Sequence, residues 1–203
     1  MGGQCQRCGR SIRAGETIAV SGVGDRCYGC FNEEMAERLG VAFDNTSLQP
    51  IVLADHDDVR RTFEIRAMLV PTGHAMIAQK VPYRRGGYRF EVLGDFEADA
   101  LELFKRLYQK MRAEMNVRYI ERTEHGWHLT DRDGLVGRIE WDEDTDGKTP
   151  ILVVDGKALS WDEVGRMLMT FEGFTLRARV EDSIEVVGGL LAARRSRGRG
   201  NGE

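Results

Sequence analysis

The chain has 203 residues, of which 41% are hydrophobic and 31% are charged, and its formal net charge at pH 7 is −4. This composition is typical of a folded globular protein and excludes a fibrous or wholly disordered one. No apolar run approaches the roughly 20 residues that cross a bilayer. The first residues also lack the basic and apolar regions of a signal peptide. We therefore expect a cytoplasmic protein with no membrane contact.

The four cysteines are the most informative feature. They form two pairs, each with two residues between the cysteines, and 18 residues separate the pairs. This spacing is typical of a four-thiolate metal site, because two intervening residues let both sulfurs of a pair reach one ion at about 2.3 Å. Disulfides are disfavoured in a reducing cytoplasm. We predict a structural zinc ion, with iron as the alternative metal, bound by Cys5, Cys8, Cys27 and Cys30.

The residues around the cysteines predict a small module. Residues 16–20 favour a strand, residues 21–25 a turn, and residues 31–39 a helix that ends at Gly40. A knuckle, a hairpin and a second knuckle leading into a helix resemble the treble-clef and zinc-ribbon modules, over residues 4–40. The resemblance implies the four ligands and no activity, because such modules bind nucleic acids, bind proteins or serve structure alone.

We divide the chain into four segments. A stretch of about 40 residues needs a metal to fold, because its core is too small. The last residues are rich in glycine and arginine and almost free of apolar side chains, so they are expected to be disordered. The predicted segments are a zinc module at 1–43, a linker at 44–58, an α+β domain at 59–187 and a disordered tail at 188–203.

The larger domain alternates between strand and helix patterns. The sequence predicts a three-stranded antiparallel meander followed by an amphipathic helix of about 18 residues, capped by Asp95. Further strands, a second helix capped by Ser160 and Glu163, and a last strand follow. The fold class is α+β, with a mainly antiparallel sheet and two covering helices. The expected strands are 63–69, 74–81, 88–92, 117–122, 126–130, 135–142, 151–154 and 174–180, with a hairpin turn at 133–134, and the second helix is 161–171.

One stretch of this domain carries a further resemblance. Residues 159–174, which read LSWDEVGRMLMTFEGF, are similar to a segment of uncharacterised bacterial domains found downstream of small zinc modules. The resemblance implies no activity.

Other candidate ligands form incomplete patterns. Asp142, Asp144, Asp146 and Gly147 match the first half of a calcium loop, but Val153 stands where the bidentate acid belongs. We therefore expect a solvated acidic turn there. His56 lies among Asp55, Asp57 and Asp58, and His125 and His128 are three residues apart on a predicted strand, so neither group makes a complete metal site.

Three functions remain open. No nucleophile motif or phosphate loop occurs, so we expect a binding or adaptor protein with a protein partner of unknown identity. The alternative is a nucleic-acid-associated protein. The third is an enzyme with an unrecognised site around His56 or His125. The arginines that favour the nucleic-acid alternative are Arg7, Arg10, Arg13 and Arg26 in the module and Arg194, Arg195, Arg197 and Arg199 in the tail.

Overall fold

The computed structural model describes residues 3–13, 15–45, 48–130, 134–142, 144–182 and 184–187. It confirms the predicted α+β class, with helices packed on mainly antiparallel sheets. The predicted tail at 188–203 and Asp133 of the predicted hairpin turn lie outside the described residues. Within the described ranges, no helix is both long enough and apolar enough to cross a membrane.

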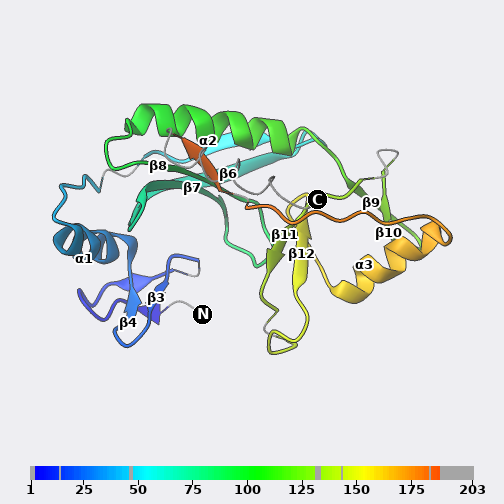
Figure 1. The fold of residues 1–203 in the computed structure, drawn as a ribbon, viewed down its shortest axis with the longest axis horizontal. Helices are drawn as coiled ribbons and strands as arrows, with labels where there is room; N and C mark the ends of the chain where they lie inside the picture. The colour runs from blue at the N-terminus through cyan, green and yellow to red at the C-terminus, as the bar shows by residue number, and fades with distance from the viewer. Residues whose placement is uncertain are drawn as a thin grey trace, which may run out of the picture.

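The N-terminal part consists of two short hairpins and a helix (Figure 1). The first hairpin pairs β1 with β2, and the second pairs β3 with β4. Helix α1 ends at Gly40, which has the left-handed φ of 66° that glycine adopts most readily, as the sequence predicts. The elements are β1 (Gly3–Gln4), β2 (Ser11–Ile12), β3 (Ile18–Val20), β4 (Gly24–Arg26) and α1 (Tyr28–Leu39).

The central part is a five-stranded sheet with the order β14-β8-β7-β6-β5. The predicted antiparallel meander is confirmed as β6, β7 and β8. Strand β5 lies inside the stretch predicted as a linker, which is therefore not unstructured, and it pairs antiparallel with the start of β6. Strand β14 pairs parallel with β8. The bounds are β5 (Ile51–Ala54), β6 (Arg60–Val70), β7 (Gly73–Val81), β8 (Arg89–Gly94) and β14 (Glu185–Val187).

Helix α2 (Ala100–Met115) lies along this sheet (Figure 1). Its buried face is a row at four-residue spacing, and it packs on the sheet through a core that includes Phe63, Ile65 and Phe90. The helix begins later than expected, because Asp99 and not Asp95 caps it by accepting a hydrogen bond from Glu102 N. The buried row of α2 is Leu103, Leu107, Met111 and Met115.

A second hydrophobic cluster lies in the C-terminal part. There β9 pairs with β10, a small sheet has the order β11-β12-β13, and α3 packs on β12 and β13. The predicted capping box at the start of α3 is confirmed, with Ser160 and Glu163 bonding each other's backbone N–H. The elements are β9 (Ile120–Thr123), β10 (Gly126–Leu129), β11 (Arg138–Glu140), β12 (Ile151–Val154), β13 (Lys157–Leu159), α3 (Trp161–Leu168) and a 3-10 turn at Met169–Phe171.

The predicted last strand at 174–180 is wrong. These residues form no strand, and Phe174, Leu176 and Val180 are exposed by 78%, 70% and 80%. Alternating apolar residues favour an extended chain, but a strand also needs a neighbouring strand whose backbone groups it can bond. The described part of the chain provides none for this segment.

Candidate metal centre

The structure brings the four cysteines together. Their Sγ atoms all lie within 4.8 Å of one another. Cys5 and Cys30 are buried, Cys27 is half-buried and Cys8 is exposed. Of the described residues, only these four form a group of three or more potential ligands close enough to share an ion.

The first pair is positioned by a tight turn between β1 and β2. Cys5 N donates to Arg10 O at 2.8 Å, and Gly9 N donates to Cys5 O at 2.8 Å. Gly9 has a φ of 72°, which a side chain would disfavour. The turn therefore folds Cys8 back toward Cys5, so that both sulfurs face the same point.

The second pair is positioned by the start of α1. Cys27 is the N-cap residue, and its carbonyl accepts a hydrogen bond from Phe31 N at 3.0 Å. Cys30 follows in the first turn, and residues three apart on a helix lie on the same face. One pair thus comes from a hairpin turn and the other from a helix terminus.

The sulfurs differ in their surroundings. Burial raises the pKa of the Cys5 thiol, but the backbone N–H groups of Cys27, Cys8 and Arg7 stabilise its thiolate and bring the pKa down to about 6. Burial and the three neighbouring thiols raise the pKa of Cys30. A cation bound among the sulfurs would favour all four thiolates. Four soft sulfur donors fit zinc, and iron shares this preference.

Asn32 attaches this module to the central sheet. It lies on α1 two residues after Cys30 and is 1% exposed. Its side-chain Oδ1 accepts from Leu69 N at 2.9 Å, and its Nδ2 donates to Ala67 O at 3.1 Å. The helical stripe that the sequence indicates, which includes Phe31 and Met35, is only half-buried. Sequence reasoning missed Asn32, and its only signal is a polar residue near a helix start, which is common.

Charged side chains form a second contact between module and sheet. Arg66 on β6 donates to Glu16 at 2.6 Å, and its guanidinium lies 5.2 Å from the centre of the Tyr28 ring. Tyr28 directly follows Cys27, one of the four candidate ligands. The module is therefore held against β6 by residues beside the metal centre.

Most module arginines face acidic residues of the chain itself. Arg7 lies within 4.0 Å of three carboxylates on α1. Arg26 is buried and donates to Glu34 at 2.8 Å. Arg13 is 3.8 Å from Glu64 of β6. The arginines that the sequence suggested for nucleic-acid contact are thus largely neutralised within the fold. The acids around Arg7 are Glu33, Glu34 and Glu37.

The predicted His56 cluster is a structural turn. Asp55 accepts from the N–H groups of Asp57 and Val59 and from Arg61 at 2.8 Å. Burial raises the pKa of Asp55, but the bonds from Arg61 and the backbone hold it below its ordinary value. The His56 side chain is 5% exposed, and no described residue hydrogen-bonds either ring nitrogen. No ligand set gathers there within the described residues.

The remaining candidates also lie apart. His125 is in the turn between β9 and β10, where it contacts Glu124 at 3.3 Å, and His128 is on β10. Asp142 is not solvated as expected, because it is 7% exposed and accepts from Arg85 at 3.1 Å and from Asp144 N. Its carboxylate is therefore committed to Arg85 and to the backbone of Asp144.

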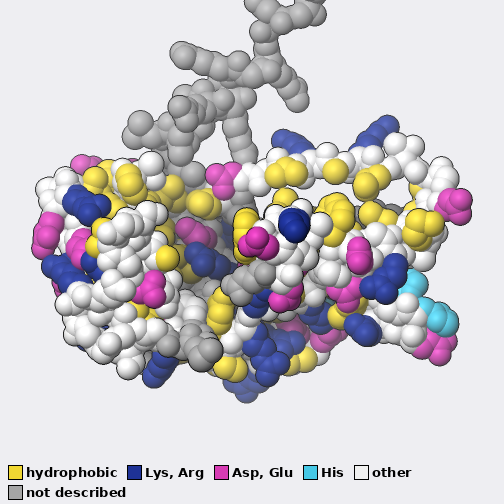
Figure 2. Space-filling model, turned by 90° about the horizontal axis from the view of Figure 1, so that it is seen from below, with side chains coloured by type: hydrophobic (Ala, Val, Ile, Leu, Met, Phe, Trp, Pro, Cys, Tyr) yellow, Lys and Arg dark blue, Asp and Glu magenta, His cyan; other side chains and the backbone are white. Residues whose placement is uncertain are grey.

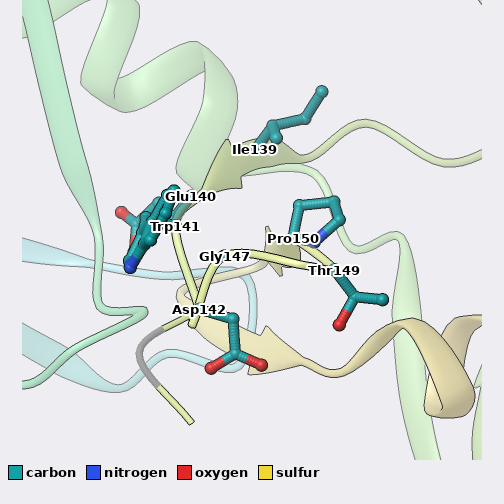
Figure 3. Close-up of a pocket in the computed structure, with 7 residues that line it drawn as sticks. All are labelled: Ile139, Glu140, Trp141, Asp142, Gly147, Thr149 and Pro150. Carbon is teal, nitrogen blue, oxygen red and sulfur yellow. The ribbon is translucent and has the colours of Figure 1, made fainter. Parts of the chain in front are cut away.

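Beside Asp142 lies a hollow which sequence reasoning missed. Its lining residues are Ile139, Glu140, Trp141, Asp142, Gly147, Thr149 and Pro150. The hollow measures about 230 Å³, and Figure 3 shows Trp141 on one side of it and Pro150 and Thr149 on the other. Trp141 is 64% exposed but held, because its ring packs on Gly147 and its carbonyl accepts from Arg85 at 2.6 Å. Ile139, two residues earlier, is 55% exposed. Figure 2 shows further exposed hydrophobic side chains on the same C-terminal part of the molecule.

Comparison with known families divides the chain into three matches. Residues 4–42 match a domain of unknown function (DUF7685), residues 44–116 match another (DUF7686), and residues 119–185 match a third (DUF7713). No curated protein matches, and no solved structure does. The first match contains the four cysteines, the second contains strands β5 to β8 of the central sheet with α2, and the third contains the C-terminal cluster with α3.

Proposed function

We propose that this chain is a zinc-binding protein of the adaptor type, in which a structural zinc ion holds the N-terminal module on a protein-binding body. The observation that carries the proposal is the convergence of four sulfurs within 4.8 Å. Four thiolates complete the tetrahedron of zinc and leave no open position for chemistry. The order of hairpins and helix around them supports a module of the treble-clef kind.

Two features favour a protein partner over a nucleic acid. Arg7 and Arg26 are paired with acids of α1, so they are poorly placed to neutralise phosphates. Trp141 and Ile139 expose apolar surface on a held segment. Exposed tryptophans in a fixed position are typical of protein-binding sites. We assign the protein-binding surface to β11 and the hollow beside Trp141.

The metal is tested by elemental analysis of the purified full chain. We expect one zinc per chain, and less than one in Cys8→Ser and Cys27→Ser variants that remain folded in the central sheet. Iron in the same site would give the visible absorption of iron-thiolate bonds. A chain that binds neither metal would refute the structural-zinc assignment.

The class of partner is tested by two measurements on the full chain. Binding of labelled RNA and DNA is measured at low and high salt, with a chain ending at Val187 as comparison. For both RNA and DNA, we expect no binding of the kind that weakens steeply as the salt concentration rises. Chemical cross-links to bound proteins should map near Trp141 and disappear in Trp141→Ser. Tight salt-dependent binding of nucleic acid would replace the adaptor proposal with the alternative.

A further inference from the structure

Strand β11 is the edge of its sheet. It pairs with β12 on one side, and no described strand pairs with it on the other. Proteins usually protect such edges with charges or proline, as Pro50 does directly before the edge strand β5. Strand β11 carries two charged residues, Arg138 and Glu140, which are half-buried, while its exposed position is the apolar Ile139. Trp141, just beyond the strand, is also exposed and apolar. The edge therefore has the character of a strand acceptor.

The segment 174–181 has the complementary character. It reads FTLRARVE, with apolar residues at every second position and polar or charged residues between them. It is extended and largely exposed, and no described strand pairs with it. An exposed segment with strand alternation and no neighbour is a strand donor without an acceptor.

We propose that residues 177–181 of one copy add as an antiparallel strand to β11 of a second copy. Arg179 and Glu181 then stand opposite Glu140 and Arg138. Arg177 stands opposite Asp142, whose buried carboxylate already accepts from Arg85. Ala178 and Val180 stand opposite Trp141 and Ile139. Every opposed charged pair has opposite signs, and every other pair is apolar.

The charges and the apolar row favour this register over registers shifted by one or two residues. A shift of two residues in one direction places Arg179 opposite Arg138, and in the other direction it places Glu181 opposite Glu140. Like charges directly opposite each other destabilise a pair of strands. A shift of one residue turns the apolar row to the other face. Within one copy, Arg138 contacts Glu140 and donates to the carbonyls of Gly87 and Arg89, and Arg179 contacts Glu181. In the proposed register these two ion pairs face each other with opposite charges opposed.

The apolar row supplies the driving force. Ile139 is opposite Leu152 of β12, and Leu152 is opposite Leu159 of β13, so the three residues lie on one face of the sheet. On that face, Leu159 belongs to the hydrophobic cluster under α3. Helix α3 packs on β12 and β13, and the large exposure of Ile139 shows that this cover does not extend over β11. Val180 of the second copy would cover Ile139, and the small Ala178 would leave room for the Trp141 ring.

The contact is reciprocal. Each copy has one acceptor and one donor, so two identical contacts close a two-fold dimer and leave neither segment unpaired. The inference rests on the proposal that the β11 surface binds protein, and it names a second copy of this chain as the partner.

The test is the sedimentation of the zinc-loaded full chain at micromolar concentration. We expect a dimer for the wild type and a monomer for Val180→Glu, whose position is 80% exposed and leaves folding undisturbed. Ile139→Lys alone should also be monomeric. Leu101→Glu on α2 is the matched control, because Leu101 is 59% exposed against 55% for Ile139. That variant should remain dimeric.

Mixing the two monomeric variants decides the register. In the mixture, the introduced lysine of Ile139→Lys faces the introduced glutamate of Val180→Glu at one contact, and the wild-type pair remains at the other, so a heterodimer should form. A monomeric wild type, a dimer that survives both substitutions, or a mixture that stays monomeric would overturn the inference. Rescue by mixing Ile139→Lys with Ile139→Glu would mean that β11 pairs with itself, and would overturn it also. A monomeric chain whose Trp141→Ser variant still loses cross-links to another protein would refute the dimer and leave the adaptor function standing.

Discussion

The side-chain amide of Asn32 hydrogen-bonds the edge of β6 at Leu69, beyond the residues of β6 that pair with β5. Strand β5 covers β6 only from Arg60 to Phe63. Further along, Asn32 accepts from Leu69 N and donates to Ala67 O, as a neighbouring strand would. Because Asn32 follows the candidate ligand Cys30 by two residues, the predicted metal centre and the sheet edge share one helical turn.

Substitution of Asn32 tests this attachment. Asn32→Ala would leave the N–H of Leu69 and the C=O of Ala67 without their partner in a buried place. We expect the free energy of unfolding to fall by about 3 kcal/mol, since each unsatisfied buried group costs on the order of 1–3 kcal/mol. Urea unfolding of the zinc-loaded chain measures it.

Asn45→Ala is the matched control for that measurement. Asn45 accepts from Asn32 Nδ2 at 2.7 Å but is itself exposed, so water can replace it. We expect a loss of no more than about 1 kcal/mol. Equal losses in the two variants would show that the attachment to β6 adds nothing.

Removal of the metal should unfold the module and spare the central sheet. The hydrophobic cluster of the module consists of Cys5, Ile12 and Cys30, which is too small to fold alone. The sheet and α2 have their own core. After chelation, we expect rapid hydrogen exchange throughout α1 and continued protection of β7.

Hydrogen exchange of the Leu69 backbone amide is the most specific measurement in that experiment. Its N–H donates to Asn32 Oδ1 on the side of β6 that faces the module, so its exchange should accelerate together with α1 and not with β7. A chelated sample in which α1 and Leu69 keep their native protection would contradict the zinc-dependent module.

The acid stability of the fold should depend on His74. Burial lowers the pKa of His74 from its ordinary value of 6.5, and the carboxylate of Asp95 opposes this only in part. The unfolded chain therefore binds the proton more tightly, so the stability from neutral His74 is complete above pH 6.5 and declines as the pH falls below that value.

His74→Phe isolates this contribution. The His74 ring packs edge-on against Phe43 and Phe96, and its Nε2 has no hydrogen-bond partner among the described residues, so phenylalanine suits the site. We expect the free energy of unfolding to fall between about pH 7 and pH 5 in both proteins, and to fall less in the variant. Parallel declines would rule out His74 as the titrating group.

The candidate metal ligands could be predicted because their chemistry is local in sequence. Two residues between thiolates specify a knuckle whatever the rest of the chain does, and the structure brings Cys5, Cys8, Cys27 and Cys30 together. The capping box at Ser160 and the glycine at the end of α1 are local in the same way. The meander followed from short connections between alternating segments.

The features that the sequence did not predict depend on partners that are distant in sequence. The pattern of 174–180 predicts a strand but cannot supply the neighbouring strand that it needs. The four residues of β5 lie in the stretch interpreted as a linker, and only their pairing with β6 makes them a strand. Asp142 looks solvated in sequence, but Arg85 reaches it from 57 residues away. Asn32 is buried because it supplies the hydrogen-bond partners of two backbone groups of β6, the N–H of Leu69 and the C=O of Ala67.

Substitution of Gly147 tests whether the fixed position of Trp141 matters for assembly. A Cβ at Gly147 would lie 1.9 Å from the Trp141 ring, so Gly147→Ala must displace the indole from the surface that we assign to protein binding. We expect weaker dimerisation and a shift in tryptophan emission. The control is Gly22→Ala, because Gly22 has a φ of 74° against 69° for Gly147 and no atom within 4 Å of its Cβ position. Both variants place a side chain at a left-handed φ, which costs roughly 1–2 kcal/mol, so a difference in dimerisation between them reports the displaced ring. If both sediment as the wild type does, the held position of Trp141 is irrelevant to assembly.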